Sequence, residues 1–504
     1  MKRYRISIIF IFFSIVLLIS GYNKFGNSSI DGAKPVGAEE VVDPCDYNRV
    51  IHQLQELGFR GKIIATLEDR KQMAQDYGNR VKKIPPLSLA PVSALDVSIV
   101  VTAARTQKCQ IVTRGTGHAL DGQSQSDKAI ILITRDLLLP SGKTVEVLTR
   151  AGRKVARLSS GQKWYDAVTK LYDYGLRPVV FLEIPGLSVG GTLSVGGIGY
   201  GSHQFGLQID TVTQLTAVDG LGKIRDCAPK GYNKEASMDD RFCESLLGGQ
   251  GQFGVITSAE IEVTSAKPYI HVKKEVEPDL DHFLDKMESA ASNWNVFELF
   301  GYITYDQEPR YVVSVGITSD SPTPTDPLDT VSPFLLYVKK LEYATAVDYN
   351  SSGRTPYSPA WLNLLVSDRA KFSAIFRSNP ELMKTLQGND FFMIVPIKGP
   401  RLHHDSLLQS VTENPGTGTF VIHLDQIRSD FNTSEELRKR NAKLLEVFVA
   451  PPFDGRRYWI DDLPRGPKLW ELNFGAYYDR VRANKIASDP DMVFRPFPFL
   501  FTPN

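Results

Sequence analysis

The sequence lacks an excess of charge of either sign. Its 504 residues include 58 lysines and arginines against 57 aspartates and glutamates, so the net charge is +1. Without a basic surplus no long-range field gathers phosphate groups, and nucleic acid is not an expected partner. The nearest basic cluster, Arg438 to Lys443, follows acidic residues, and we interpret it as one solvated face of a helix.

Cysteine is also scarce. The four cysteines, Cys45, Cys109, Cys227 and Cys243, show neither a CxxC pair nor a Cys/His spacing typical of metal ligands, so we expect no metal site. In an exported chain they can form no disulfide, one or two, and the sequence does not choose among these. The composition, 42% apolar and 23% charged, is that of an ordinary globular protein.

Long hydrophobic runs are missing, with one exception at the N-terminus. Lys2, Arg3 and Arg5 precede the uncharged apolar run Ile6 to Ser20, a pattern typical of an export signal. The run is shorter than the roughly 20 residues that span a bilayer, which favours a cleaved signal and leaves a membrane tether open. We therefore expect a secreted, periplasmic or membrane-anchored protein, with residues 1–21 as signal peptide or anchor and 22–41 as a flexible lead-in.

The remaining chain has the alternating patterns of an α+β protein of two domains. Pro44 to Lys71 shows helical spacing. Ser93 with Asp96 resembles a capping box and predicts a helix start, and a short β run follows at Cys109 to Thr113. Glycine density falls near residue 266. We place the first domain at 42–266 and the second at 267–465.

Three segments of the first domain are rich in glycine: Arg114 to Gln125, Leu187 to Gly206 and Leu246 to Thr257. Glycine is usually retained where the backbone must bend or approach a ligand closely. Backbone N–H groups of such loops bind anions, and the pyrophosphate of a dinucleotide is a suitable ligand. None of the three has the G-x-G-x-x-G spacing in the context of a Rossmann fingerprint. Each loop alone is better explained by a plain turn.

Together and in this order, the three glycine-rich segments resemble the FAD-binding domain of the vanillyl-alcohol-oxidase type, also called the PCMH type. Within that superfamily, the chain resembles cytokinin dehydrogenase in RGTGHALDGQ, in DYGN (Asp76 to Asn79) and in PAWLNLLV (Pro359 to Val366). The closing text NFGAYYDRVRANKIASDPDMVF is similar too. The resemblance covers most of residues 74–501. It implies a substrate domain with an antiparallel sheet, and a C-terminal segment, 466–504, that returns to the FAD-binding domain.

The resemblance gives His118 a specific role. In the family, a histidine at this position is bonded to the 8α-methyl group of the flavin, which fixes the ring and makes it a stronger oxidant. Relatives of the berberine-bridge type add a cysteine link from the loop 187–199; that loop has no cysteine here, so a single bond is implied. A histidine that only caps a turn is the alternative. The other residues implied to line FAD are Thr113, Arg114, Gly115, Thr116, Gly117, Ala119, Gln123, Ser188, Ser194, Ile198 and Ile256.

Glu183 takes the position of the aspartate that serves the family as catalytic base. Amine oxidation by hydride transfer needs a group that accepts the nitrogen's proton, and burial beside a flavin raises a carboxyl pKa, which suits that role. The extra methylene of Glu183 displaces its oxygens relative to an aspartate. An exposed loop glutamate is the alternative.

Two further residues concern the substrate. Trp361 matches an aromatic of the family's substrate channel, where a planar adenine packs against apolar walls. A tryptophan of the core is the alternative. The family often has an acidic residue near the start of the second domain that recognises adenine. The nearest acidic residue here is Glu298, in VFELFGYI, but its position in the sequence is out of register with that of the family.

The implied reaction is FAD-dependent oxidation of the side-chain amine of an N6-substituted adenine, a cytokinin, to adenine and an aldehyde, with a quinone or oxygen as electron acceptor. One alternative is a related covalent-flavin oxidase of an alcohol, sugar or secondary metabolite. Another is a binding protein without catalysis, which the departures from the family pattern at Ala119 and in the closing RPFPFLF would favour.

Overall fold

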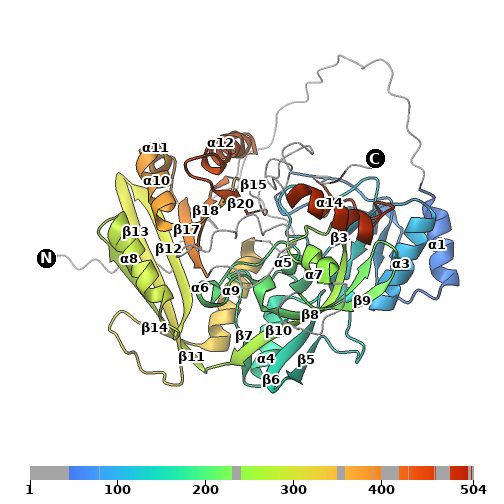
Figure 1. Ribbon diagram of the computed structural model, residues 1–504, viewed down its shortest axis with the longest axis horizontal. Helices are drawn as coiled ribbons and strands as arrows, with labels where there is room; N and C mark the ends of the chain where they lie inside the picture. Colours follow the sequence, from blue (N-terminus) through green and yellow to red (C-terminus); the bar gives the residue numbers. More distant parts are fainter. Residues whose placement is uncertain are drawn as a thin grey trace, which may run out of the picture. The chain divides into compact units, whose positions relative to one another are not determined.

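The computed structural model describes residues 45–78, 80–229, 240–348, 358–388, 390–398, 419–428, 431–458, 460, 477–497 and 501. They belong to one compact unit, Cys45–Asn504 (Figure 1). The predicted export segment, 1–21, and the lead-in, 22–41, lie outside the described residues. Within the described part, no helix has the length and apolarity that a membrane crossing requires.

A four-stranded sheet with the order β1-β2-β4-β3 opens the unit. Its elements are α1 (Tyr47–Glu56), β1 (Lys62–Ile64), α2 (Leu67–Lys71), β2 (Ser88–Ala90), α3 (Ala94–Thr106), β3 (Ile111–Arg114) and β4 (Ile130–Ile133). Strand β4 pairs in parallel with β2 and β3, while β1 is antiparallel to β2. Helix α3 buries Val97, Val100, Val101 and Ala104 completely, because these apolar residues share one face of the helix.

The start of this region differs from its sequence pattern in two ways. Strand β1 interrupts the stretch with helical spacing, because its pairing with β2 overrides local propensity. Ser93 caps α3 by accepting the N–H of Asp96 at 3.1 Å, but the Asp96 carboxylate accepts the N–H groups of Val92 and Arg60. Only half of the predicted capping box therefore forms, and Asp96 ties the helix to the segment before β1.

A second, six-stranded sheet has the order β5-β6-β10-β8-β9, with β7 paired to β10. All its pairings are antiparallel. Its strands are β5 (Val145–Arg150), β6 (Arg153–Ser159), β7 (Leu176–Pro178), β8 (Val212–Asp219), β9 (Ile224–Cys227) and β10 (Gly254–Ser265). The helices that accompany it are α4 (Trp164–Tyr172), α5 (Val189–Leu193), α6 (Ser202–Phe205) and α7 (Asp240–Leu246), with 3-10 turns at Thr134–Asp136 and Gln208–Thr211.

The four cysteines form two disulfides, a choice that the sequence leaves open. Cys45 pairs with Cys109, and Cys227 pairs with Cys243. The first joins Cys45, two residues before α1, to the segment between α3 and β3, and the second joins β9 to α7. Both therefore lie in the part of the chain that carries the first two sheets.

The third sheet has eight antiparallel strands in the order β14-β11-β13-β12-β17-β18-β16-β20, and β10 ends four residues before its first strand, β11, begins. Its strands are β11 (Tyr269–Glu277), β12 (Val296–Asp306), β13 (Glu308–Ser319), β14 (Thr330–Pro333), β16 (Leu362–Val366), β17 (Phe391–Ile397), β18 (Thr419–Asp425) and β20 (Arg456–Arg457). The other elements here are α8 (Leu280–Ala291), α9 (Phe334–Asp348), β15 (Ser358–Pro359), α10 (Arg369–Ser378), α11 (Pro380–Lys384), β19 (Ile427–Arg428) and α12 (Phe431–Val449). The α+β class is confirmed.

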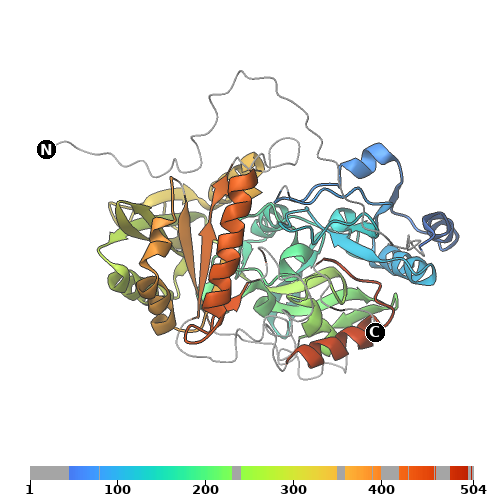
Figure 2. The ribbon, with the colours of Figure 1, turned by 90° about the horizontal axis from the view of Figure 1, so that it is seen from above.

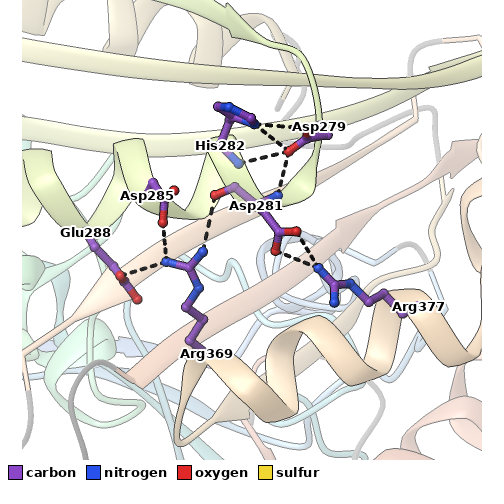
Figure 3. Close-up of polar contacts among 7 residues, drawn as sticks. All are labelled: Asp279, Asp281, His282, Asp285, Glu288, Arg369 and Arg377. Atoms are coloured by element: carbon purple, nitrogen blue, oxygen red, sulfur yellow. Dashed lines mark hydrogen bonds and ion pairs between the residues drawn. The ribbon is translucent and has the colours of Figure 1, made fainter.

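One face of the eight-stranded sheet is covered by α8, α10, α11 and α12, and Figure 2 shows α12 running along its strands. Phe283 of α8, Phe372 of α10 and Phe448 of α12 are buried in the core between these helices and the sheet. At the outer edge of this layer, Arg369 and Arg377 of α10 bind acidic residues of α8 (Figure 3). These ion pairs are solvent-exposed and contribute little, so the buried aromatic core holds the layer together.

The predicted basic cluster lies on α12, but it is not a uniformly solvated face. Arg438 is only 3% exposed; it donates to Ser434 and to the Pro359 carbonyl, and it forms an ion pair with Glu435. Burial lowers the pKa of Arg438. The interpretation as a solvated face is therefore wrong at this position, because tertiary packing brings β15 against the helix.

The closing segment lies against the first two sheets. Helix α14 (Tyr477–Ser488) contacts α7, and the Ile111 N–H of β3 donates to the Val493 carbonyl at 2.7 Å (Figure 1). Lys485 of this helix is 1% exposed, and its ammonium group binds Asp489 and the carbonyls of Gln252 and Phe494. The lysine thus joins the closing segment to the third glycine-rich loop.

Replacing Lys485 with methionine should lower the free energy of unfolding by about 3–5 kcal/mol, because it leaves the buried Asp489 carboxylate without its cation. Urea unfolding of Lys485→Met measures the loss. Ile486→Ala, at a residue that is 43% exposed on the same helix, is the control and should change stability far less. Equal effects of the two substitutions would contradict a special role for Lys485.

Candidate active site at the glycine-rich loops

The first glycine-rich loop begins where β3 ends. Arg114 is buried, and its guanidinium donates to Ser124 Oγ at 3.3 Å and to the Gln75 carbonyl at 3.2 Å. Gly117 has a φ of +82°, and a Cβ at that position would overlap the Arg114 guanidinium. Glycine is therefore favoured at position 117, both by the left-handed backbone and by the space that the Arg114 side chain occupies.

The three glycine-rich loops meet in space. The N–H groups of Gly248 and Gln250, in the third loop, donate to the carbonyls of Leu193 and Ser194, in the second, each at 2.8 Å. A Cβ added at Gly115 would overlap Ser188 Oγ, so the first loop touches the second at a point where only glycine fits. Gly251 of the third loop lies beside Thr113, which directly precedes the first loop in β3. The structure thus brings together segments that lie far apart in the sequence.

The other predicted cofactor residues lie on the same loops. Gln123 accepts the Asp121 N–H at 2.9 Å through its side-chain oxygen, and Ser194 Oγ donates to the Gly190 carbonyl at 2.7 Å. Ile256 is buried in β10, whereas Thr116, Ala119 and Ile198 are partly exposed.

Polar groups around the loops fit a dinucleotide. Ser160 Oγ, Gln125 Oε1 and both amide atoms of Gln208 are buried and have no hydrogen-bond partner within the described residues. Ser160 lies against Gly190, and Gln208 lies against Gly197, whose φ is +74°. Buried polar atoms without partners are costly, and a bound polar group would satisfy them. Close backbone packing together with such atoms suits FAD, which has many hydrogen-bonding groups.

His118, in the first loop, is partly buried and lies against an aromatic residue of the DYGN segment. Its ring stacks on Tyr77, with 3.6 Å between ring centroids, and the Tyr77 N–H donates to the Ala119 carbonyl at 2.9 Å. Burial lowers the pKa of His118 to about 3, so its imidazole is neutral at physiological pH. A neutral ring nitrogen has the lone pair that a bond to flavin requires.

Glu183 is partly buried and is held next to the second loop. Phe181 and Tyr200 exchange both backbone hydrogen bonds, at 3.0 and 2.7 Å, and this pairing fixes the segment that carries Glu183 against the segment that carries Ile198. Burial, together with the nearby Glu298 carboxylate, raises the pKa of Glu183 to about 7. The Lys274 ammonium and a hydrogen bond from Tyr302 oppose this shift. The pKa is therefore close to neutral, as a general base requires.

The face of the eight-stranded sheet opposite α8, α10, α11 and α12 packs into the core that it shares with the six-stranded sheet, and it supplies the groups around Glu183. Side chains alternate along a strand, so Glu298, Phe300 and Tyr302 of β12 share this face. A β-bulge at the start of β12 inserts Phe297 and sets this alternation. Glu298 accepts hydrogen bonds from Tyr337 and from Ser314 Oγ, the latter at 2.7 Å. Glu298, out of register in the sequence, thus reaches the site through the bulge.

Trp361 lies at the far end of the same face. Its indole N–H donates to Asp425 Oδ1 at 2.8 Å, and its ring packs edge-on against His423 with 4.9 Å between centroids. The ring centroids of Tyr77 and Trp361 are 6.5 Å apart. Because Tyr77 also stacks on His118, the three rings of Trp361, Tyr77 and His118 form a row between the predicted substrate residue and the predicted flavin attachment site. Trp361 is only partly buried, which distinguishes it from a core tryptophan such as the fully buried Trp164.

Sequence reasoning missed four residues of the site: Tyr77, Lys274, Tyr302 and Asp425. Tyr77 lies inside the DYGN motif, whose resemblance to the family gives the tyrosine no role by itself. The others have no local motif. Only the period-two pattern of their strands indicates that each shares a face with its neighbours, and the strand order that joins these faces is a tertiary property.

One stretch of the chain contains α3, strands β2 to β9 and the first two glycine-rich loops. Residues 85–228 match the family described as "FAD binding domain". This match, with the joined loops, defines the chain as an FAD-linked oxidoreductase. Over 505 aligned residues it is 30% identical to cytokinin dehydrogenase 8 of Oryza sativa subsp. indica, covering 86% of this chain and 91% of the rice protein. The chain therefore belongs to the family of FAD-linked oxidoreductases that contains the cytokinin dehydrogenases.

Solved structures show that the fold occurs in several oxidases. A chitooligosaccharide oxidase superposes with a TM-score of 0.67 at 14% identity, covering 89% of this chain and 98% of that one. The 6-hydroxy-D-nicotine oxidase of Arthrobacter nicotinovorans superposes with a TM-score of 0.63 at 18% identity, covering 88% and 98%. At these identities the likeness concerns the fold alone.

The contact between the first two loops gives a direct test of the FAD site. A methyl group at Gly115 would press on Ser188, and overpacking of this kind costs roughly 1–3 kcal/mol, so Gly115→Ala should bind FAD about tenfold to a hundredfold more weakly. Flavin content per purified chain measures this. Adding Ser188→Gly removes the obstructing side chain and should restore part of the flavin. No loss in the single variant would contradict the packing argument.

Proposed function

We propose that the protein oxidises the side-chain amine of an N6-substituted adenine, with FAD attached covalently to His118. The observation that carries the proposal is the position of Glu183. This carboxyl group, with a pKa of about 7, is fixed beside the second glycine-rich loop and accepts a hydrogen bond from Tyr302. The relation to a cytokinin dehydrogenase supports the substrate class.

In this reaction the two hydrogens leave the substrate separately. FAD held at the three glycine-rich loops would supply the acceptor for the hydride that leaves the carbon next to the amine. Glu183 accepts the proton of the amine nitrogen, so that a C=N bond forms. Water then hydrolyses the imine to adenine and an aldehyde, and a quinone or oxygen takes the two electrons from the reduced enzyme.

The residues around Glu183 suit this proton transfer. Burial keeps the pKa of Tyr302 well above its ordinary value, so the phenol stays neutral and donates to the ionised carboxylate. This bond orients the Glu183 oxygens. Because the glutamate side chain is longer than that of aspartate, such an external hold helps to keep its oxygens in one position.

A second candidate is oxidation of an alcohol or sugar hydroxyl. One observation favours it: the hydroxyl groups of Tyr200 and Tyr337 are 2.9 Å apart and, with Tyr302, make the wall beside Glu183 rich in hydrogen-bonding phenols. The same base would accept the hydroxyl proton. Substrate profiling with a dye as electron acceptor, comparing isopentenyladenine with oligosaccharides, separates the two candidates.

The proposal is tested by anaerobic mixing of the purified protein with isopentenyladenine. Loss of the visible absorption of oxidised flavin, with adenine and an aldehyde as products, is the expected result. Unchanged absorption with isopentenyladenine, together with bleaching by a sugar, would replace the proposed function with the second candidate.

We also propose that the mature protein works in an oxidising compartment outside the cytoplasm. Two disulfides are the supporting observation, since such bonds persist mainly in exported proteins. The apolar run Ile6 to Ser20 would direct the export.

A further inference from the structure

We propose that Arg80 is a positioning residue for covalent attachment of the flavin, because its guanidinium group holds the first glycine-rich loop in the conformation that presents His118. The inference rests on the attachment to His118 that is part of the proposed function, and it names a residue on which this attachment depends. Arg80 directly follows DYGN in the sequence. It acts through its contact with Asp121, three residues after His118.

The first step is the support on which the loop segment 118–122 lies. Each of its five residues contacts a residue of the DYGN segment or one of the two residues that follow it. The contacting pairs are His118–Tyr77, Ala119–Tyr77, Leu120–Gly78, Asp121–Arg80 and Gly122–Val81. Glycine permits this close approach, since a Cβ at Gly78 would overlap the Leu120 carbonyl and a Cβ at Gly122 would overlap Val81. The contacts run in the same order along both segments, so the position of one segment determines the position of the other.

The second step is the ion pair within this set of contacts. Arg80 Nη1 lies 3.1 Å from Asp121 Oδ1, and the two side chains are only 13% and 2% exposed. A pair that is largely removed from water is screened much less than a pair on the surface, so its attraction is correspondingly stronger. The ion pair therefore fixes the part of the loop that follows His118, while the stacked Tyr77 ring supports His118 itself.

The third step is that Arg80 is held at both its backbone and its side chain. Asp76, which is buried, accepts the N–H of Arg80 at 3.0 Å and the N–H of Val81 at 3.2 Å through Oδ1. The second terminal nitrogen of Arg80 lies 3.6 Å from the Glu435 carboxylate of α12. The planar fork of a guanidinium group can serve two carboxylates at once, which an ammonium group does less well.

The fourth step is what the attachment reaction requires. An N–C bond forms between the imidazole and the 8α-methyl carbon, and each of the two groups loses a proton. The electron pair of the broken C–H bond and both protons reduce the isoalloxazine ring, and the quinone or oxygen of the proposed function then removes the two electrons. Such a reaction needs close alignment, because a displacement of about 1 Å can slow it by about a hundredfold.

The test measures the ratio of acid-stable to total flavin in the full-length protein, purified after the same expression time for every variant. Arg80→Met keeps the length of the side chain and removes the ion pair, so this ratio should fall about tenfold, while the three joined loops still bind FAD. Arg80→Lys keeps the charge without the fork and should restore part of the adduct. Mass spectrometry of the peptide that contains His118 gives a second measure of the adduct.

Further variants separate positioning from folding. Arg80→Met leaves the buried Asp121 without this cation, which can impair folding. The double variant Arg80→Met/Asp121→Asn removes both charges and should show the same low ratio in a folded protein. Lys83→Met is the matched control, because it removes the exposed ion pair of Lys83 with Asp127 in the same part of the chain and should keep the adduct. Glu435→Gln leaves the pair with Asp121 intact and should keep it as well.

The results distinguish failure of this inference from failure of the proposed function. An adduct in the wild type, with the same ratio in Arg80→Met and in the double variant, overturns the role of Arg80 alone. A loss of adduct in Lys83→Met or Glu435→Gln as large as in Arg80→Met also overturns it, because the effect would not be specific to the pair with Asp121. A wild type without an adduct overturns covalent attachment and the role of Arg80 together, whereas turnover of isopentenyladenine by that protein would still support the proposed substrate class.

Discussion

Replacing His118 with alanine will remove all acid-stable flavin from the protein. The wild-type chain should retain its yellow colour after acid precipitation, and mass spectrometry should find an FAD adduct on the peptide that contains His118. The substitution removes the only nitrogen nucleophile that the first glycine-rich loop presents next to the stacked Tyr77 ring. Activity should fall as well, because a covalent bond raises the oxidising power of the flavin.

The matched control is Tyr77→Phe, which keeps the ring against His118 and should keep the adduct. The His118→Ala protein should still bind some FAD non-covalently, since the three joined loops remain, and the released flavin can be measured after acid treatment. An adduct on a different peptide of the wild-type protein would refute the assignment of His118, and a wild type that releases all its flavin in acid would refute covalent attachment.

Replacing Glu183 with glutamine should lower kcat/KM for the amine substrate by about 10²–10⁴-fold, the usual contribution of a general base. The pH profile provides the specific signature. Glu183 accepts a proton only when it is ionised, and burial raises its pKa to about 7, so the wild-type kcat/KM should fall below about pH 7. The glutamine variant should lack this acidic limb. Glu183→Asp restores the shorter carboxylate of the family and should retain part of the activity with a similar limb.

The thermal stability of the Glu183→Gln variant shows whether this variant folds. The folded-state pKa of Glu183 lies above its ordinary value of 4.5, so the folded protein binds more protons than the unfolded chain between about pH 4.5 and 7. Stability contributed by this group is therefore lost as pH rises through that interval. Above pH 7, Glu183→Gln should have a higher Tm than the wild type while being nearly inactive. A lower Tm at pH 8, or full activity, would argue against a buried catalytic base.

Parts of the fold were accessible from local sequence patterns. The helix at Ala94–Thr106 has its apolar residues on one face and a serine before it, so the spacing of apolar residues and the N-cap both predict a helix that starts here. Strand β1 was missed because three residues carry little pattern and depend on β2 for their hydrogen bonds. Arg438 was misread because its burial results from packing against β15, which a charged sequence does not reveal.

Some residues of the site are also marked in the sequence, whereas others are placed only by strand pairing. Glycines mark the three loops in the sequence because a Cβ would collide there, as it would at Gly115 and Gly117. Glu298 was judged out of register because a β-bulge, which depends on strand pairing, sets where it points. Asp425 and Tyr302 come from different strands and have no motif, so only sheet register places them on one face.

The sequence by itself determined that this chain is an α+β protein with three glycine-rich loops suited to FAD, because glycine positions and apolar periods are local properties of the chain. The tertiary structure decided how both disulfides pair, which groups surround Glu183, and that Trp361 orients Asp425 on the same face. These features depend on contacts between residues far apart in the sequence, and the pKa of a carboxyl group depends on the burial and charges that only such contacts create.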